Sequence, residues 1–338
     1  VFTISTNIQI SIMAVKITKD TKAVIPTVME FKDKHQTIFY GSPGCALDMA
    51  IHKAIREWGE QEKIDKEDFQ FFHTTFHPAT TYDHFVSTEK TYTHKNITTL
   101  EYNLKVFMQA YKAACSKDTP VILVIKDIHR GDVPKIFGEF YSLLDRVNGE
   151  SEHPVETDHN LAVALNSGDS RISKTSISLP SNFYIWATMT TGEEAAFAMD
   201  YAFQRKWFWE YVPLNVENCI NFDIEIGGNS YRWYDILKAI NDVIFRYTHS
   251  EEQLLGELFI DNNKNYYIWR SSDFKNFVMR HLWYTFCKDN YGTDKNFFRY
   301  QDPQFKGATV EFTFQQLFTS KGDDILEKLL DFIGCPAV

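Results

Sequence analysis

The sequence lacks most of the signals that quickly assign a chain to a class. No apolar run approaches the roughly 20 residues needed to cross a bilayer, so no membrane association is expected. No pair of cysteines, or of cysteine and histidine, has zinc-binding spacing, and the five cysteines are scattered, which favours a reduced, cytoplasmic compartment. No run of lysine or arginine occurs and the net charge is −10, so this region alone is not expected to bind DNA directly.

At 338 residues, the chain is long enough for two domains, or for one large domain with an appendage. A change of character at Pro213 predicts an α/β core domain over residues 24–213 and a mainly helical C-terminal domain over residues 214–338. Residues 1–23 are predicted to be an N-terminal extension, and the polar residues 149–179 a loop inserted into the core. The chain begins at Val1 without a signal-peptide pattern, so we expect a piece of a longer protein, or a start at Met13.

Strand and helix patterns alternate through the first part of the chain. Short runs rich in β-branched and aromatic residues predict strands over residues 7–13, 37–40, 70–76, 120–126, 182–188 and 207–212. Apolar residues at helical spacing predict helices over residues 25–34, from the turn at Gly44 to about residue 63, and over 100–116, 133–147 and 194–206. This alternation predicts a mostly parallel sheet. Further amphipathic helices are expected at residues 231–247, 250–258, 272–290 and 323–333.

Residues 37–48 are the stretch around which these elements are arranged, because a strand runs there into a glycine-rich turn and then a helix. This is the outline of a phosphate-binding loop, G-x-x-x-x-G-K-[S/T], whose lysine contacts the β- and γ-phosphates and whose hydroxyl binds Mg²⁺. The motif positions are filled here by Gly41, Ser42, Pro43, Gly44, Cys45, Ala46, Leu47 and Asp48. The second glycine, the lysine and the hydroxyl are therefore missing. Taken alone, the stretch is more simply interpreted as a strand–turn–helix connection.

Three later segments make the interpretation more specific. Residues 76–86 are FHPATTYDHFV, residues 124–145 are VIKDIHRGDVPKIFGEFYSLLD, and residues 179–214 are LPSNFYIWATMTTGEEAAFAMDYAFQRKWFWEYVPL. In order and spacing they resemble three motifs of the McrB-type AAA+ GTPases of modification-dependent restriction systems: F-H-P-x-x-x-Y-x-x-F-V, [D/E]-E-I-N-R-G-N and L-P-x-N-[L/F]-Y-I-[W/I]-A-T-M-N-T. The resemblance covers most of residues 20–335. It implies an AAA+ P-loop-type α/β domain followed by a helical lid domain.

The departures from the family pattern fall on the residues that would carry the chemistry. By the resemblance, Leu47 and Asp48 replace the phosphate lysine and the Mg²⁺ hydroxyl, and Lys126 replaces the Mg²⁺ carboxylate. Asp127 stands for the catalytic glutamate, and Thr190 stands at the sensor position whose asparagine orients water. The positions that serve packing are kept. This pattern is typical of a degenerate, catalytically inactive family member.

Two of these replacements are complementary in charge. In a working site the loop hydroxyl and the strand-end carboxylate lie side by side around Mg²⁺, so we predict an Asp48–Lys126 ion pair in the vacated metal position, and no metal. Asp48 also places a negative charge in the first turn of a helix, where a phosphate would otherwise bind. Arg130 and Arg205 are candidate arginine fingers toward a neighbouring subunit's nucleotide, or, equally, residues of salt bridges within the subunit.

These features predict a pseudo-NTPase without a cofactor, acting as a structural or regulatory subunit of a homo- or hetero-oligomeric AAA+ ring. The resemblance implies a role in DNA restriction or anti-phage defence, and a nuclease partner of the McrC type. Two alternatives stay open. One is a divergent NTPase that binds GTP or ATP with Mg²⁺ and hydrolyses it weakly through Asp127 and a trans arginine. The other is a monomeric protein-interaction scaffold.

Overall fold

The computed structural model describes residues 30–338, apart from 95–96, 167–171, 173–174, 192–199, 215–221, 261–268 and 303–306. The predicted N-terminal extension, with the strand predicted at residues 7–13, lies outside these described residues, as does most of the helix predicted at 25–34. The described part of that helix is a single 3₁₀ turn, η1 (Phe31–Asp33).

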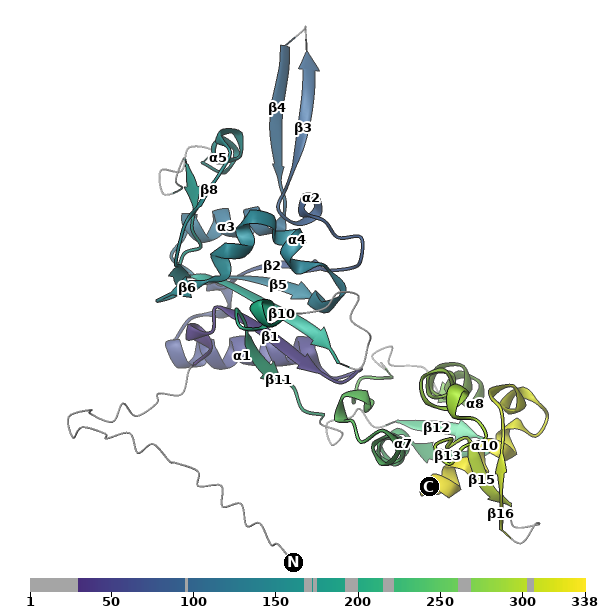
Figure 1. Ribbon diagram of the computed structural model, residues 1–338. Coiled ribbons are helices and arrows are strands. Elements are labelled where there is room, and N and C mark those ends of the chain that lie inside the picture. The colour runs from purple at the N-terminus through teal and green to yellow at the C-terminus, as the bar shows by residue number, and fades with distance from the viewer. Residues whose placement is uncertain are drawn as a thin grey trace, which may run out of the picture.

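A five-stranded sheet forms the centre of the first part of the chain (Figure 1). Its strands lie in the order β11 (Phe208–Tyr211), β1 (Gln36–Gly41), β10 (Phe183–Thr190), β5 (Val121–Lys126) and β2 (Gln70–Thr75). Every neighbouring pair is parallel. The carboxyl ends of all five strands therefore point to one edge of the sheet, where the register sets Gly41 beside Thr190 and Thr75 beside Lys126.

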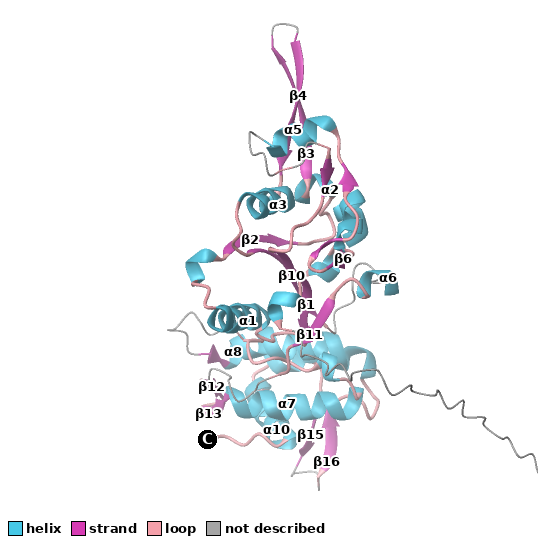
Figure 2. Ribbon diagram, turned by 90° about the vertical axis from the view of Figure 1, so that its left-hand side faces the viewer, coloured by secondary structure: helices cyan, strands magenta, loops and turns pink. Residues whose placement is uncertain are grey.

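A separate apolar layer covers each face of the sheet. On one face, α1 (Leu47–Glu62) buries Ile51, Ile55 and Trp58 at the predicted helical spacing, and η1 packs beside it. On the other face lie α3 (Val106–Ser116), α4 (Val133–Phe137) and the 3₁₀ helix η4 (Gly138–Leu144). Figure 2 shows α1 and α3 on opposite sides of the sheet. The central strands β5 and β10 are buried along nearly their whole length, because their apolar residues serve both layers.

Two helices predicted in the core are shorter than expected. Residues 100–104 belong to β4 (Ile97–Leu104) rather than to the helix predicted at 100–116, because they pair antiparallel with β3 (Ser87–His94). In Figure 1 this hairpin projects away from the sheet, after the short helix α2 (Tyr82–Phe85). The helix predicted at 133–147 ends at Phe137, since Gly138 has a φ of +57°. The chain continues there as η4 and then as β6 (Arg146–Val147).

The prediction of a plain loop over residues 149–179 is wrong. This stretch contains β7 (Glu150–Ser151), β8 (Val155–Glu156), α5 (His159–Asn166) and β9 (Ser176–Ile177). It is ordered into these elements because β6 pairs with β7 and β8 with β9, while Leu161 and Leu165 of α5 join the same apolar core as α3. Of the helix predicted at 194–206, the described part is α6 (Tyr201–Gln204).

After β11, the chain builds a second apolar core around helices. The elements are β12 (Asp223–Ile226), β13 (Asn229–Arg232), α7 (Trp233–Thr248), β14 (Trp269–Arg270), a helical run of α8 (Ser271–Phe274), η7 (Lys275–Met279), α9 (Arg280–Leu282), η8 (Trp283–Cys287) and η9 (Lys288–Asn290), then β15 (Arg299–Asp302), β16 (Ala308–Glu311), η11 (Phe314–Phe318) and α10 (Gly322–Ile333). The predicted class, an α/β fold with a mostly parallel sheet followed by a mainly helical part, is confirmed.

One helix predicted in the second part is wrong. Residues 250–258 are helical only over the 3₁₀ turn η6 (Glu251–Gln253), and the N–H groups of Gly256 and Leu258 bond to the first part of the chain instead. Among the described helices, none combines the length and the apolar character that a bilayer crossing requires.

Candidate functional site

The carboxyl ends of β1 and β10 form a switch point in the sheet. The chain leaves β1 for α1 on one face, whereas it leaves β10 for α6 on the other, where Phe203 is buried. In open parallel sheets, ligands bind in the crevice outside such a point. Residues 41–48 lie at this edge, between β1 and α1. The structure thus puts the predicted loop where the topology favours a ligand site.

Two glycines of the loop have no room for a side chain. Gly44 has a φ of +81°, and a Cβ there would lie 2.7 Å from the backbone nitrogen of Phe259. A Cβ on Gly41 would lie 2.7 Å from the carbonyl oxygen of Val212, just after β11. The loop is therefore closely covered by backbone from two other parts of the chain.

Part of the loop backbone is turned inward. The Cys45 N–H donates to the carbonyl of Ser42 at 3.0 Å, and the Leu47 N–H donates to the carbonyl of Cys45 at 2.8 Å. In a phosphate-binding loop, successive N–H groups point outward and cradle the phosphate oxygens. Two such donors are already used here. Burial also raises the pKa of the Cys45 thiol to about 12, so this side chain stays neutral.

Residues 251–258, which we call the clamp segment, hold the loop from the second part of the chain. The Gly256 N–H donates to the carbonyl of Pro43 at 2.6 Å, and the Leu258 N–H donates to the carbonyl of Gly44 at 2.9 Å. A Cβ on Gly256 would lie 2.1 Å from the carbonyl carbon of Gly44. The two backbones therefore meet at a distance that only glycine permits.

Side chains secure the clamp segment at both ends. The Ser42 hydroxyl donates to the carbonyl of Glu251 at 2.9 Å. The buried amide of Asn241 on α7 makes two bonds to Leu255, donating to its carbonyl at 2.9 Å and accepting from its N–H at 2.8 Å. Sequence reasoning missed the contact between the clamp segment and the loop, although a glycine at position 256, inside a predicted helix, was a signal against that helix.

Asp48 and Lys126 face each other at the open end of the site. Lys126 Nζ lies 2.5 Å from Asp48 Oδ2, so the two side chains form an ion pair. Both remain about half exposed, at 53% and 43%, and exposed pairs contribute only about 0–1 kcal/mol to stability. The main effect of the pair is thus on charge, because it sets a carboxylate in the first turn of α1. Leu47 beside it is a buried residue of α1 that also lines the site.

A hollow of about 280 Å³ lies next to this pair. It is lined by loop residues 45–49 with Lys126, Asp127, Thr188 and Leu258 of the clamp segment. Sites for small molecules usually measure about 300–1,000 Å³, so the hollow is at the lower limit. A larger hollow of about 790 Å³, between α1 and β2, also reaches Asp48 and Lys126.

Asp127 and Thr190 lie at the same sheet edge as the loop. Asp127 adopts a left-handed backbone conformation, with a φ of +54°, which aspartate tolerates better than most residues. Its N–H donates to the hydroxyl of Thr188 at 3.2 Å, and it directly precedes the 3₁₀ helix η3 (Ile128–Arg130). Thr190 lies beside Gly41 in the sheet register. Thr188, which sequence reasoning missed, is the residue of β10 that contacts Asp127.

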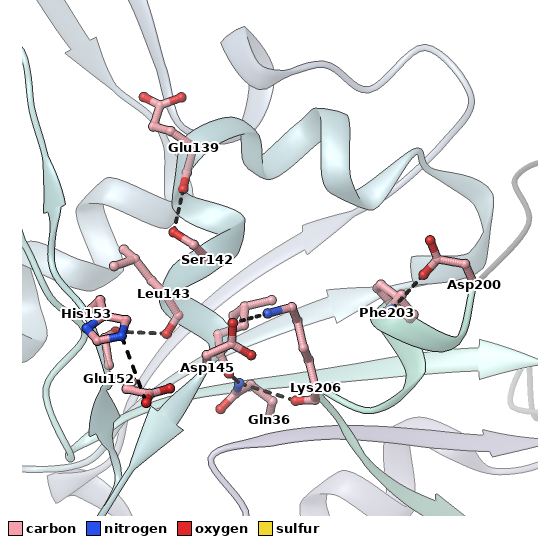
Figure 3. A network of polar contacts seen from close by, with 12 residues as sticks. Gln36, Glu139, Ser142, Leu143, Asp145, Glu152, His153, Asp200, Phe203 and Lys206 are labelled. Carbon is pink, nitrogen blue, oxygen red and sulfur yellow. Dashed lines mark hydrogen bonds and ion pairs between the residues drawn. The ribbon is translucent and has the colours of Figure 1, made fainter.

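The basic residues of the second and third motifs divide into two groups. Lys206 Nζ forms a 2.5 Å ion pair with Asp145 (Figure 3). The same atom lies 5.1 Å from the ring centre of Tyr141, and the Lys206 side chain is only 6% exposed. Lys206 is thus engaged within the chain. Arg205 and Arg130 are exposed at the ends of α6 and η3. In the described part of the chain, no hydrogen bond or ion pair joins either arginine to residues 41–48.

Metal binding finds no support in the described residues. No three histidine, cysteine or carboxylate side chains among them come together in a way that could hold an ion. At the position where a Mg²⁺ ligand would be expected, the structure has the ammonium group of Lys126.

Comparisons with known proteins found a similar restriction-enzyme component and a similar solved structure to set beside this chain. No protein-family model matches the chain. The sequence is 27% identical over 276 residues to the type II restriction enzyme BsuMI component YdiS of Bacillus subtilis (strain 168), covering 72% of this chain and 77% of that protein. A crystal structure of a candidate ATPase from Cytophaga hutchinsonii aligns over 89% of this chain and 71% of its own at 12% identity. Its TM-score of 0.29 is too low to establish a shared fold.

Proposed function

We propose that this chain is a catalytically inactive, AAA+-type subunit of a DNA restriction system, with a structural or regulatory role. The observation that carries the proposal is the Asp48–Lys126 ion pair. It sets a carboxylate where the loop would offer a hydroxyl to Mg²⁺, and an ammonium where the neighbouring strand would offer a carboxylate. Sequence similarity to a component of the BsuMI restriction enzyme supports the biological setting.

The expected effect on nucleotide binding is large. A charge-assisted hydrogen bond contributes about 1.5–3 kcal/mol, so loss of the loop lysine alone costs roughly 10- to 150-fold in affinity. Asp48 adds repulsion toward phosphate, and the N–H groups of Cys45 and Leu47 are already bonded within the loop. Lys126 would repel the Mg²⁺ that normally screens the phosphates. All of these effects oppose the same ligand.

Assembly is the second part of the proposal. The family that the motifs resemble forms rings that drive a nuclease, and BsuMI YdiS is named as one component of an enzyme. We place this chain as one subunit of a homo- or hetero-oligomeric ring with a nuclease partner of the McrC type. The exposed Arg130 and Arg205 are its candidates for contacting a neighbouring subunit's nucleotide. A solution mass equal to one chain, alone and with its partner subunits, would favour the monomeric scaffold instead.

Calorimetric titration with GTP and ATP, with and without Mg²⁺, tests the loss of nucleotide binding. We expect no heat of binding up to about 1 mM nucleotide, the upper range of ordinary enzyme KM values. The matched variant restores the lysine, the hydroxyl and the strand-end carboxylate through Leu47→Lys, Asp48→Thr and Lys126→Asp, and it should bind at least about tenfold more tightly. A restored variant that binds no better would show that these side chains are not what excludes nucleotide.

Tight, Mg²⁺-dependent binding by the unmodified chain would contradict the proposal. It would favour the divergent NTPase that acts through Asp127 and a trans arginine. In that case Asp127→Asn should abolish turnover while leaving nucleotide binding in place, because the carboxylate would act on water and not on the base or the phosphates.

A further inference from the structure

The larger hollow, which we call the β2 groove, has the form of a site for an extended chain. It measures about 790 Å³ and runs between α1 and β2. Its lining combines apolar side chains, including Ile51, Ile55, Ile64, Phe69 and Phe71, with charged ones, including Asp48, Arg56, Glu60, Lys63, Asp65, Lys66 and Lys126. Phe69, just before β2, and Phe71 and His73 of β2 form a stacked series of rings, with ring centres 6.2 and 6.3 Å apart. Alternate side chains of a neighbouring strand would therefore meet alternate aromatic rings.

The outer edge of β2 carries unpaired backbone groups. Among the described residues, β2 is the last strand of the sheet and pairs only with β5. The N–H groups of Gln70 and Phe76 donate toward β5, so the backbone groups of the odd-numbered residues between them point away from it. Within the described part of the chain, no hydrogen bond reaches the backbone of Phe71, His73 or Thr75 from outside the sheet. These groups can accept a further strand.

β2 also lacks the features that normally protect an edge. Edge strands usually carry lysine, proline, inward charges or a bulge, which prevent unwanted pairing. The sequence of β2, QFFHTT, has no charged residue and no proline, and its register with β5 is continuous. A regular, uncharged edge of this kind is open to pairing with a further strand.

The chain itself contains a segment with the matching pattern. From residue 2 to residue 12, apolar and polar residues alternate almost strictly: Phe2, Ile4, Ile8, Ile10 and Ile12 on one side, and Thr3, Ser5, Asn7, Gln9 and Ser11 on the other. Alternation with a period of two indicates a strand with one buried face. The segment has no charged residue, so it would enter the groove without leaving an unpaired charge.

The described chain begins close to the groove. Lys32, two residues after Glu30, pairs with Glu62 at 2.6 Å, and Glu62 ends α1 next to the groove wall at Lys63 and Ile64. Phe31 packs on Trp186, on the same face of the sheet as α1. The 17 residues from 13 to 29 can span up to roughly 55–60 Å, whereas six-residue β2 is only about 20 Å long. The reach is therefore more than sufficient.

We propose that residues 7–13 add to the free edge of β2 as an additional strand of the sheet, with Ile8, Ile10 and Ile12 in the β2 groove. The aromatic side chains of β2 pack against these residues, and the outer backbone groups of β2 gain partners. This pairing is an attachment of the N-terminal segment to the core, and it is independent of nucleotide.

Hydrogen exchange of the full chain, followed by mass spectrometry of peptides over residues 70–76, tests this pairing. The unmodified chain should show exchange at this edge at least about tenfold slower than Ile10→Asp, which places a charge in the groove. The matched control is Ser11→Asp, the same charge one residue further on the polar side, which should keep the slow exchange. Peptides from β5 should exchange alike in all three proteins, which shows that the sheet remains folded.

Equal exchange at residues 70–76 in the unmodified chain and in Ile10→Asp would overturn the proposal. So would equal loss of protection in both variants, because the alternation of faces would then have no role. Protection that disappears on dilution would overturn the assignment to the same chain, because it would identify a strand from a second copy.

Discussion

Replacing Gly256 with alanine is expected to separate the clamp segment from the loop. The new Cβ would lie 2.1 Å from the carbonyl carbon of Gly44 and 2.3 Å from the nitrogen of Cys45. Both are backbone atoms, so no side-chain rotation relieves the overlap. The clamp segment has to move away, and the bonds from Gly256 to Pro43 and from Leu258 to Gly44 break.

The size of the effect follows from the bonds that are lost. Those two backbone bonds and the Ser42–Glu251 bond each contribute about 0.5–1.5 kcal/mol net, so the variant should lose about 1.5–4.5 kcal/mol of stability. A loss of 1 kcal/mol in the free energy of unfolding lowers the melting temperature by about 2–4 °C for domains of 150–250 residues. The melting temperature should therefore fall by about 3 °C or more.

Two measurements check this reasoning. Calorimetric melting should show the lower midpoint, and hydrogen exchange should accelerate at the N–H groups of Gly256 and Leu258. Gly228→Ala is the control. Gly228 has a φ of +91°, and a Cβ added there would have no neighbouring atom within 4 Å. It should carry backbone strain of about 1–2 kcal/mol without changing exchange at the clamp segment. A Gly256→Ala protein with an unchanged midpoint and slow exchange would refute the contact.

Three further predictions concern side chains. Asp323→Ala should lower the free energy of unfolding by about 2–3 kcal/mol in a denaturant titration. This is less than the ~3–5 kcal/mol of a fully buried pair, because the partner Lys275 is buried but Asp323 is half exposed. The neighbouring Asp324→Ala removes only an exposed pair and should cost under about 0.5 kcal/mol. Asp48→Asn should change stability by less than about 1 kcal/mol, and a larger loss would make its ion pair with Lys126 a structural one. Burial lowers the pKa of His35 below its usual 6.5, so its contribution to stability is complete above that pH and declines as the pH falls below it. His35→Gln should therefore flatten the melting temperature between about pH 5 and 7, and an unchanged slope would exclude this role.

The central strands were predictable because their sequence permits few alternatives. An uninterrupted Val-Ile-Leu-Val-Ile run, as in β5, has no polar face to turn to water, so it fits only a strand covered on both sides. α1 was predictable for a similar reason, since Leu47, Ile51, Ile55 and Trp58 share one helical face and all are buried.

The elements that were missed depend on partners far away in the sequence. Leu100 and Leu104 are four residues apart, a spacing that fits a helix, but pairing with β3 decides in favour of a strand. Residues 254–258 contain apolar residues at helical spacing, yet their backbone bonds go to the loop about 210 residues earlier. The local sequence pattern indicates neither of these distant partners.

The candidate site was predictable to the extent that it rests on aligned motifs. Positions 48 and 126 follow from the two motifs and from the common carboxyl edge of parallel strands, and the structure brings their side chains together. The inward loop N–H groups, the Thr188–Asp127 bond and the clamp segment required the structure, because each depends on backbone direction rather than on residue type.

The ion pair and the clamp segment act on different atoms of the same loop. The pair places its charges at Asp48 and Lys126, whereas the clamp bonds to the carbonyls of Pro43 and Gly44. A ligand moves one part of a protein relative to another only if its contacts differ between the two positions. Here direct backbone bonds join the loop to the second part of the chain, so a nucleotide has little left to contribute to closure. Within the proposed assembly, we therefore expect this subunit to keep one relative position of its two parts whether or not GTP or ATP is present.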